Sequence, residues 1–258
     1  MSTLVFGGTG FIGEFVLEEL TEAVSIDAST PRGIVEKHLK NATYILWLIP
    51  PVEGLLKSFT GELQSADRLK RFLFASSLLL YGDSDRPQVE SASLAPKTPY
   101  ERAKKDEEEL LRGIFSATPE KLLIARIGSV YGGPKSAGVI GKILSSLKSG
   151  NSFTINGDGS QIRDYIYVED VVRTLSSLMK EARAHGIYNI STGKGHSLNE
   201  VIAKIERIAK RKVSVIHGAR EEEKYAIVGD NAKIVHLIKN LEFESLDAGL
   251  EKAYTRYQ

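Results

Sequence analysis

The sequence predicts an α/β fold, in which a doubly wound parallel sheet is joined to a smaller C-terminal portion. Three observations support this prediction. Apolar segments of strand length alternate with helical segments along the 258 residues, and such alternation is typical of a parallel sheet covered by helices on both faces. A glycine-rich turn directly follows the first apolar segment. The chain is 42% hydrophobic, which is enough to bury a substantial core.

The predicted elements alternate from the start of the chain. Strands are expected at 3–6, 23–27, 44–49, 71–75, 121–126, 187–190 and 212–216. Helices are expected at 14–20, 54–66, 100–113, 137–149, 168–184, 197–211, 231–239 and 246–256. A polar, proline-containing loop at 83–97 separates the fourth strand from the third helix.

The first candidate site is the run Gly7-Gly8-Thr9-Gly10-Phe11-Ile12-Gly13, between the first strand and the first helix. Glycines let the backbone turn sharply and approach a phosphate closely. The helix start then offers free N–H groups and the positive end of its dipole to an anion. The spacing differs from the G-x-G-x-x-G fingerprint, and the alternative is a turn that binds nothing. We expect this run to bind the pyrophosphate of a dinucleotide through Gly7, Gly10, Phe11, Ile12 and Gly13.

Two further motifs supply groups that can move a proton. Ser76 and Ser77 end the fourth predicted strand, where ligands of open α/β sheets bind. Pro99 can open a helix on which Tyr100 and Lys104 lie four residues apart, and therefore on one face. A lysine ammonium near a tyrosine favours the phenolate and lowers the pKa of the tyrosine. Such a group can take a proton while a nicotinamide takes a hydride, although a Tyr-x-x-x-Lys pair also occurs by chance.

With these motifs the chain resembles the extended short-chain dehydrogenase/reductases, specifically the NAD-dependent nucleotide-sugar epimerase/dehydratase group. The glycine run matches that group's TGGxGFIG, with Phe6 in place of threonine. The segment 76–82 matches SSxxxYG, and the segment 98–104 matches SPYxxSK. The segment 156–170 resembles GDGxQxRDFxYVxD, which is the most specific match. The chain is identified as an atypically short member of this group.

The resemblance implies a Rossmann-like fold in two portions. Residues 1–127 and 160–191 would form the dinucleotide-binding domain, and residues 128–159 and 192–258 the substrate-binding portion. The implied cofactor is NAD, with NADP not excluded. The implied substrate is a nucleotide-diphosphate sugar, and the implied assembly is a homodimer through helices near 54–66 and 100–113. The first of these helices carries an apolar stripe, Leu55, Leu56, Phe59 and Leu63, which could instead pack on the chain's own sheet.

The resemblance also assigns roles to individual residues. The catalytic residues would be Ser77, Tyr100 and Lys104, with Tyr100 as general base. Besides the glycine run, the cofactor would contact Asp27, Leu48, Ile49, Pro50, Tyr100 and Lys104. The substrate would contact Ser77, Tyr81, Ser129, Arg163 and Arg220. The two arginines would clamp the diphosphate, because a planar guanidinium suits two parallel bonds to a phosphate.

Several departures from the family pattern bear on function. Only four strands are predicted before Ser77, which is one strand–helix unit fewer than in the family. Asp27 lies twenty residues after Gly7, where a ribose-binding carboxylate favours NAD; on another alignment the second strand is missing and Asp27 lies near adenine. Ser129 stands where epimerases commonly have asparagine. Leu78-Leu79 replaces the acid pair of dehydratases, so dehydration is the least favoured reaction.

These features favour an NAD(P)-dependent nucleotide-sugar epimerase. The alternatives are a keto-sugar reductase on the same scaffold and a non-catalytic dinucleotide- or sugar-nucleotide-binding protein. A formal net charge of +1 gives no electrostatic case for nucleic acid. The chain has no cysteine, its histidines have no metal-ligand spacing, and no apolar run approaches the ~20 residues of a membrane span. A strand at the very N-terminus leaves no room for a signal peptide, so we expect a cytoplasmic protein.

Overall fold

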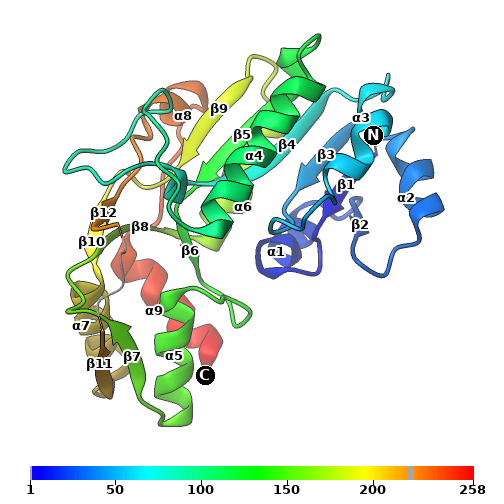
Figure 1. The fold of residues 1–258 in the computed structure, drawn as a ribbon. Coiled ribbons are helices and arrows are strands. Elements are labelled where there is room, and N and C mark those ends of the chain that lie inside the picture. The colour runs from blue at the N-terminus through cyan, green and yellow to red at the C-terminus, as the bar shows by residue number, and fades with distance from the viewer. Residues whose placement is uncertain (1, 220–223) are drawn as a thin grey trace.

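The structure, a computed structural model, describes residues 2–219 and 224–258. Its larger portion is a six-stranded parallel sheet with the order β2-β1-β3-β4-β5-β9 (Figure 1). The predicted doubly wound α/β fold is confirmed. The strands are β1 (Thr3–Phe6), β2 (Val24–Ile26), β3 (Tyr44–Trp47), β4 (Arg71–Ser77), β5 (Leu122–Ile127) and β9 (Gly186–Ile190).

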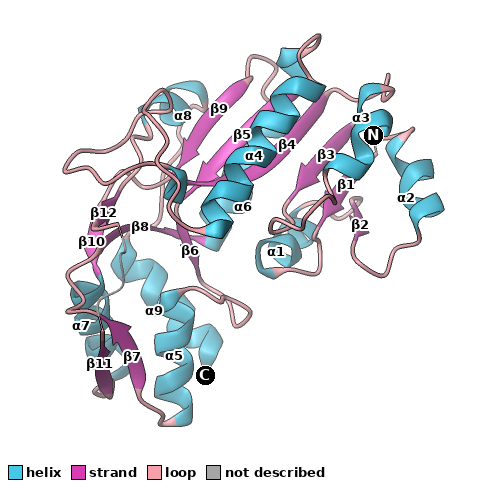
Figure 2. Cartoon of the chain, viewed as in Figure 1, coloured by secondary structure: helices cyan, strands magenta, loops and turns pink. Residues whose placement is uncertain are grey.

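Helices cover both faces of this sheet (Figure 2). On one face, α2 (Arg32–Leu39), α3 (Thr60–Gln64) and α4 (Pro99–Ile114) share a buried cluster with Trp47 and Phe72 of the sheet. On the other face, α1 (Phe11–Glu19), α6 (Val168–Lys180) and α8 (Ala232–Leu237) share a second cluster with Val5 and Leu123. Alternate residues of each buried strand thus point to opposite clusters, as the two-residue period of a strand requires.

On the N-terminal side of the sheet, β2 is the one strand that lies beyond β1. The N–H of Gly7 donates to the carbonyl of Ile26 at 2.9 Å, so β2 ends directly beside the glycine run. The chain then passes through α2, on the face opposite α1, to reach β3 on the far side of β1. Four strands begin before Ser77, as predicted, and β2 is the outermost strand of the sheet. Asp27, which follows β2, therefore lies at the carboxyl edge next to the glycine run.

The smaller portion is built around a third buried cluster (Figure 1). Its central strand, β8 (Ile162–Tyr167), pairs with β6 (Ser129–Tyr131), β10 (Gly195–Ser197) and β12 (Ala226–Ile227). A separate parallel pair joins β7 (Phe153–Asn156) to β11 (Val215–Gly218). The helices of this portion are α5 (Val139–Ser149), α7 (Leu198–Ala209) and α9 (Leu246–Tyr257).

Two elements lie across the boundaries that we expected from the sequence. Strand β8 belongs to the smaller sheet, although 160–191 was assigned to the larger portion, because its backbone pairs with β6 and β10. Helix α8 packs on the larger sheet, although 192–258 was assigned to the smaller portion, because Ile234 is buried in the cluster that contains Ile190. Short 3₁₀ helices at Lys57–Phe59, Leu78–Leu80 and Pro119–Lys121 complete the described elements.

The expected helix at 54–66 begins as a 3₁₀ turn and continues as the five-residue α3. Leu56, Phe59 and Leu63 of its apolar stripe are buried against the chain's own sheet. The stripe is therefore part of the core. Within residues 2–219 and 224–258, every helix is too short or too polar to span a lipid bilayer.

Candidate active site

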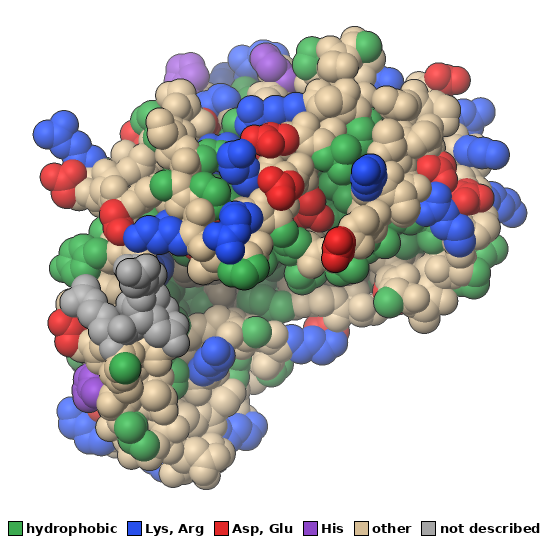
Figure 3. All heavy atoms as spheres, in the orientation of Figure 1, with side chains coloured by type: hydrophobic (Ala, Val, Ile, Leu, Met, Phe, Trp, Pro, Cys, Tyr) green, Lys and Arg blue, Asp and Glu red, His purple; other side chains and the backbone are tan. Residues whose placement is uncertain are grey.

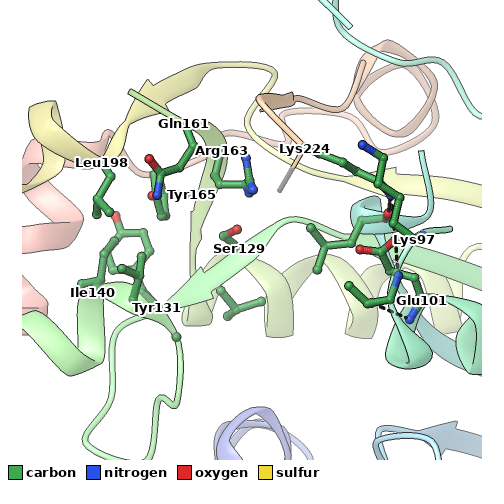
Figure 4. Close-up of a pocket in the computed structure, with 15 residues that line it drawn as sticks. Lys97, Glu101, Ser129, Tyr131, Ile140, Gln161, Arg163, Tyr165, Leu198 and Lys224 are labelled. Atoms are coloured by element: carbon green, nitrogen blue, oxygen red, sulfur yellow. Dashed lines mark hydrogen bonds and ion pairs between the residues drawn. The ribbon is translucent and has the colours of Figure 1, made fainter. Parts of the chain in front are cut away.

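A cavity of about 460 Å³ lies between the two portions of the chain. Its lining comes from β6, β8 and the starts of α5 and α7 on one side, and from the start of α4 on the other. In the space-filling view the surface is hollowed between the larger upper part and the smaller lower part (Figure 3). In Figure 4, Arg163 and Ser129 lie in the middle of the cavity, Leu198 lies toward one end and Glu101 toward the other.

A smaller cavity of about 90 Å³ adjoins the first, and Ser77, Ser129 and Arg163 all line it. The last two of these residues also line the larger cavity. The Ser77 hydroxyl accepts a hydrogen bond from the N–H of Leu79 at 3.2 Å, which fixes it at the end of β4. Three residues with predicted substrate contacts are thus brought together from β4, β6 and β8.

The glycine run forms a cradle in which a side chain at Gly8 or Gly13 would clash with its surroundings. Gly7 has a φ of +85°, which favours glycine. A Cβ on Gly13 would lie 2.1 Å from the carbonyl oxygen of Gly7, and a Cβ on Gly8 would lie 2.3 Å from the Ser25 hydroxyl. Gly10 caps α1 without a side-chain hydrogen bond, so the helix start is left to an external acceptor. The cradle fits a pyrophosphate.

Asp27 supplies a carboxylate at the same edge. Its Oδ1 accepts hydrogen bonds from the N–H and the hydroxyl of Ser29, at 2.9 and 2.6 Å. These bonds hold the pKa of Asp27 below its ordinary value, so the group is ionised at neutral pH. An ionised carboxylate beside the end of β1 can accept bonds from ribose hydroxyls, and the residues of this half therefore fit an NAD molecule.

The segment after β3 closes the other side of the glycine run. A Cβ on Gly7 would lie 3.2 Å from the Ile49 nitrogen and from the Leu48 carbonyl carbon. Leu48 and Ile49 are half-buried, and Pro50 is exposed. The carbonyl of Ile49 accepts a hydrogen bond from Lys104 Nζ at 3.3 Å. The predicted nicotinamide side thus lies between the glycine run and α4.

Tyr100 and Lys104 lie on α4, which begins with a capping box. Thr98 accepts from the N–H of Glu101, while the Glu101 side chain accepts from the N–H of Thr98. Tyr100 is 43% exposed, and Thr98 and Glu101 on either side of it line the larger cavity. Lys104 is buried, with Nζ 4.3 Å from the centre of the Phe74 ring.

The predicted effect of Lys104 on Tyr100 is wrong for this structure. The pKa of Tyr100 is raised above its ordinary value, first by partial burial and then by the negative charge of Glu107. Lys104 Nζ makes an ion pair of 3.3 Å with Glu107. The carboxylate of Glu107, one turn further along the helix from Lys104, was not part of the prediction.

Of the two arginines that were predicted to contact the substrate, the structure describes Arg163. Arg163 lines both cavities and donates from Nη1 to the carbonyl of Ile162 at 2.8 Å. Its guanidinium is thereby held at the middle of the site (Figure 4). Arg220 lies outside the described residues.

Tyr81, a predicted substrate contact, lies away from both cavities. It has no exposed surface, and its hydroxyl donates to Asn189 at 2.8 Å and accepts from Arg126 at 3.0 Å. The tyrosine therefore has a structural position in this fold, between β4, β5 and β9. The spacing of the SSxxxYG motif gave no information on which of its side chains point inward.

A buried ion pair that the sequence did not predict lies at one end of the cavity. Lys224 Nζ lies 2.8 Å from Glu101 Oε2, and the two side chains are 3% and 6% exposed. Lys97 lines the same end and faces Asp83 at 3.8 Å. The partners Glu101 and Lys224 are 123 residues apart in the chain, so no local spacing signals the pair. In the part of the chain that the structure describes, no group of metal-ligating side chains is present.

Comparison with known proteins identifies the family. The sequence pattern of the NAD dependent epimerase/dehydratase family matches residues 56–191, more than half of the chain. The chain belongs to this family. The predicted resemblance is thereby confirmed, and the matched region includes the strand-end serines, Tyr100, Lys104 and Arg163.

Curated relatives match over different lengths. UDP-glucose 4-epimerase 4 of Oryza sativa is 29% identical over 184 residues, which are 62% of this chain and 50% of that protein. An uncharacterized UDP-glucose epimerase of Bacillus subtilis is 25% identical over 266 residues, which are 83% of this chain and 84% of that protein. The chain spans about half the length of the rice relatives that it matches.

Solved structures confirm the fold. UDP-glucuronic acid 4-epimerase of Bacillus cereus, in complex with NAD and a fluorinated UDP-sugar, superimposes with a TM-score of 0.87 at 19% identity, over 100% of this chain and 99% of that one. UDP-glucose 4-epimerase of Thermus thermophilus, in complex with NAD, gives a TM-score of 0.80 at 23% identity, over 100% and 99% of the two chains.

Proposed function

We propose that the protein is an NAD-dependent nucleotide-sugar epimerase. The observation that carries the proposal is the meeting of Ser77, Ser129 and Arg163 in adjoining cavities beside the helix that bears Tyr100. The glycine cradle and Asp27 lie at the same carboxyl edge of the sheet. The family and the relatives named above support this reaction over the alternatives.

Each half of the site has a separate task. The glycine run, Asp27 and Lys104 would hold NAD, which when bound accepts a hydride from a sugar carbon and returns it. Tyr100 takes the proton from the hydroxyl on that carbon, and Ser77 holds the same oxygen. When the hydride returns to the opposite face of the keto-sugar, Tyr100 would give the proton back to the oxygen, so the configuration at that carbon would be inverted.

The proposed substrate is a sugar joined to a nucleoside diphosphate. Arg163 lies at the middle of the cavity, where a guanidinium can make charge-assisted bonds to phosphate oxygens. The cavity volume of about 460 Å³ suits a ligand larger than a free sugar. The relatives carry UDP-sugars in their names, so UDP-glucose and UDP-glucuronic acid are the first candidates to test.

The deciding experiment follows the sugar and the cofactor together. The protein is incubated with a UDP-sugar and NAD, the products are identified by NMR, and the absorbance of reduced cofactor is recorded. We expect an equilibrium mixture of two epimers with no net change of cofactor, and no conversion by Tyr100→Phe. Stoichiometric consumption of NADH with a keto-sugar would indicate the reductase instead. Binding of NAD and UDP-sugar without conversion would indicate the binding protein.

Two further properties stay predictions. The homodimer implied by the resemblance has no support from the apolar stripe near residue 59, because that stripe is buried inside the chain. Light scattering at micromolar concentration tests the dimer, and a monomer contradicts it. Fractionation of the source cells tests the expected cytoplasmic location.

A further inference from the structure

The buried Glu101–Lys224 pair forms one end of the larger cavity. Lys224 Nζ lies 2.8 Å from Glu101 Oε2, and the two side chains are 3% and 6% exposed. Lys224 also donates to the carbonyl of Leu79, and all three residues line the cavity. Figure 4 shows the pair on the side of the cavity away from Leu198. Because both side chains are held by partners, the pair is a fixed wall of the site.

The carboxylate of Glu101 is held through one of its two oxygens. Oε2 accepts from Lys224, from the N–H of Lys97 at 2.6 Å and from the N–H of Thr98 at 3.5 Å. Burial raises the pKa of Glu101, but the bonds from Lys224 and Lys97 outweigh it, so the group is ionised at neutral pH. Among the described residues, every bond to this carboxylate reaches Oε2. Oε1 is therefore left to accept a bond from a ligand.

The charges at this end of the cavity cancel one another. Glu101 balances Lys224, and Lys97 faces Asp83 at 3.8 Å. The side chains of Lys97 and Asp83 are 49% and 43% exposed, so solvent and salt screen them. Of the described residues that line this end, none is a buried cation without a carboxylate partner. An additional negative charge would therefore find no free counter-charge here.

The sugar of the proposed substrate belongs at the same end. Glu101 directly follows Tyr100 on α4, so the pair lies at the end of the cavity that is next to the proposed base. Arg163, the proposed diphosphate contact, lies in the middle of the cavity (Figure 4). In a hexose joined to a diphosphate through C1, the carbons C4 and C5 lie on the far side of the ring. The substituent on C5 is thereby directed toward the Glu101–Lys224 pair.

We propose that the Glu101–Lys224 pair makes the site select a neutral sugar and reject a sugar acid. This selection rests on the proposed function and narrows its substrate class. A hydroxyl both donates and accepts, so it suits Oε1 of Glu101 and the third proton of Lys224, whose other two protons are used in the described bonds. A carboxylate on C5 would lose its water beside the like charge of Glu101, while the charge of Lys224 is already balanced.

The first test needs no variant. The protein with NAD is titrated calorimetrically with UDP-glucose and with UDP-glucuronic acid, which differ in the charge of the substituent on C5. We expect UDP-glucuronic acid to bind at least about tenfold more weakly, because of the like charge of Glu101. Equal or tighter binding of UDP-glucuronic acid overturns the proposal. Failure of both sugar nucleotides to bind overturns it together with the proposed function.

Two variants should shift this preference in opposite directions. Glu101→Gln removes the negative charge and keeps the capping box, because glutamine also fits this position of the box. The carboxylate of the sugar acid can then balance Lys224, and the ratio of the two affinities should move by about tenfold toward UDP-glucuronic acid. Lys224→Gln leaves the carboxylate of Glu101 alone and should move the ratio further toward UDP-glucose. Shifts in the same direction in both variants would contradict an effect of charge.

The matched control is Glu109→Gln on the same helix. Glu109 is 59% exposed and pairs with Lys105, so the control removes an equal charge away from the cavity and should leave the ratio unchanged. An unchanged ratio in Glu101→Gln overturns the proposal, as does an equal shift in Glu109→Gln.

Turnover separates this selection from the proposed function. The conversion of both sugar nucleotides is measured with NAD. Conversion of the two with equal kcat/KM supports the epimerase and overturns the selection. The expected binding preference in a protein that converts neither sugar supports the selection and overturns the proposed function instead.

Discussion

Glu108 of α4 and Arg126 of β5 form a two-bonded ion pair in the interior of the larger portion. Arg126 Nε donates to Glu108 Oε1 at 3.0 Å, and Nη2 donates to Oε2 at 2.7 Å. The Ser76 hydroxyl donates to the same carboxylate at 2.6 Å. This pair joins the helix that bears Tyr100 and Lys104 to the strand ends beneath it, and so orients the proposed catalytic groups.

Removing one partner of this pair should be strongly destabilising. In Glu108→Gln the guanidinium of Arg126 loses its buried counter-charge, and such a loss costs about 3–5 kcal/mol. Urea unfolding measures the free energy of unfolding of each variant. Glu109→Gln, which breaks the exposed pair with Lys105, is the control and should cost less than about 1 kcal/mol. Similar losses in both variants would contradict the structural role of the buried pair.

The glycine cradle predicts a sharp contrast between two alanine substitutions. In Gly13→Ala the new Cβ would lie 2.1 Å from the Gly7 carbonyl oxygen, so the loop must open and NAD binding should be lost. In Gly33→Ala, within α2, the Cβ would meet nothing within 4 Å, and the helix should gain about 0.5–1 kcal/mol. Calorimetric titration with NAD and thermal unfolding check the two effects. Normal NAD affinity in Gly13→Ala would mean that the cofactor binds elsewhere.

Arg163 should be needed for the nucleotide but not for the cofactor. We expect uridine diphosphate alone to raise the Tm of the protein, and Arg163→Ala to abolish this rise while NAD binding is retained. Arg183→Ala is a suitable control, because Arg183 is 72% exposed and pairs only with its neighbour Glu181 among the ion pairs described. Thermal protection that survives in Arg163→Ala would place the diphosphate away from this residue.

Asp164 should make the stability of the fold depend on pH. It is buried, and burial outweighs the bonds from Thr192 and Gly193 and raises its pKa to about 6. A carboxyl whose pKa is raised on folding binds more protons in the native state, so its contribution is present at low pH and is lost as pH rises toward 6. The loss should amount to about 3 kcal/mol between about pH 4 and pH 6.

The measurement is urea unfolding of the protein and of Asp164→Asn across this pH window. The variant has no carboxyl at the site, so its free energy of unfolding should fall less steeply with pH. Parallel pH profiles for the two proteins would show that Asp164 does not titrate in the window.

The sequence predicted the parts of the fold that depend on local pattern. The long apolar strands, the capped helix at Pro99 and the glycine turn each follow from neighbouring residues, and each is present in the structure. Helix α2 was missed because its buried residues are limited to Val35 and Leu39. Strands β6, β10 and β12 were missed because segments of two or three residues carry too little pattern. Strands β7 and β8 were also missed, because both mix polar with apolar residues.

The site was predictable where one motif supplies it and unpredictable where distant segments meet. Ser77 and Arg163 line one cavity, and their contact with a substrate stays a prediction. The Glu101–Lys224 pair forms because segments far apart in the chain meet at the start of α4. The buried position of Tyr81 depends on the direction in which the turn after β4 points its side chain. Glu107 was visible in the sequence as part of a run of three glutamates, but its contact with Lys104 depends on burial that the run itself does not indicate.

The contacts of α9 with the loop after β6 have a consequence for the order in which the protein is made. The Tyr257 hydroxyl donates to the carbonyl of Gly133 at 2.8 Å, and the Arg256 guanidinium lies 4.9 Å from the centre of the Phe15 ring on α1. One contact of α1 is therefore made by a helix that is synthesised long after it. During translation the early strands can pair, and α1 can pack against α6, while α9 is still inside the ribosome. A nascent chain halted before residue 246 should therefore fold its larger portion but lack the bond to Gly133 and the Arg256–Phe15 contact, which form only once α9 has emerged.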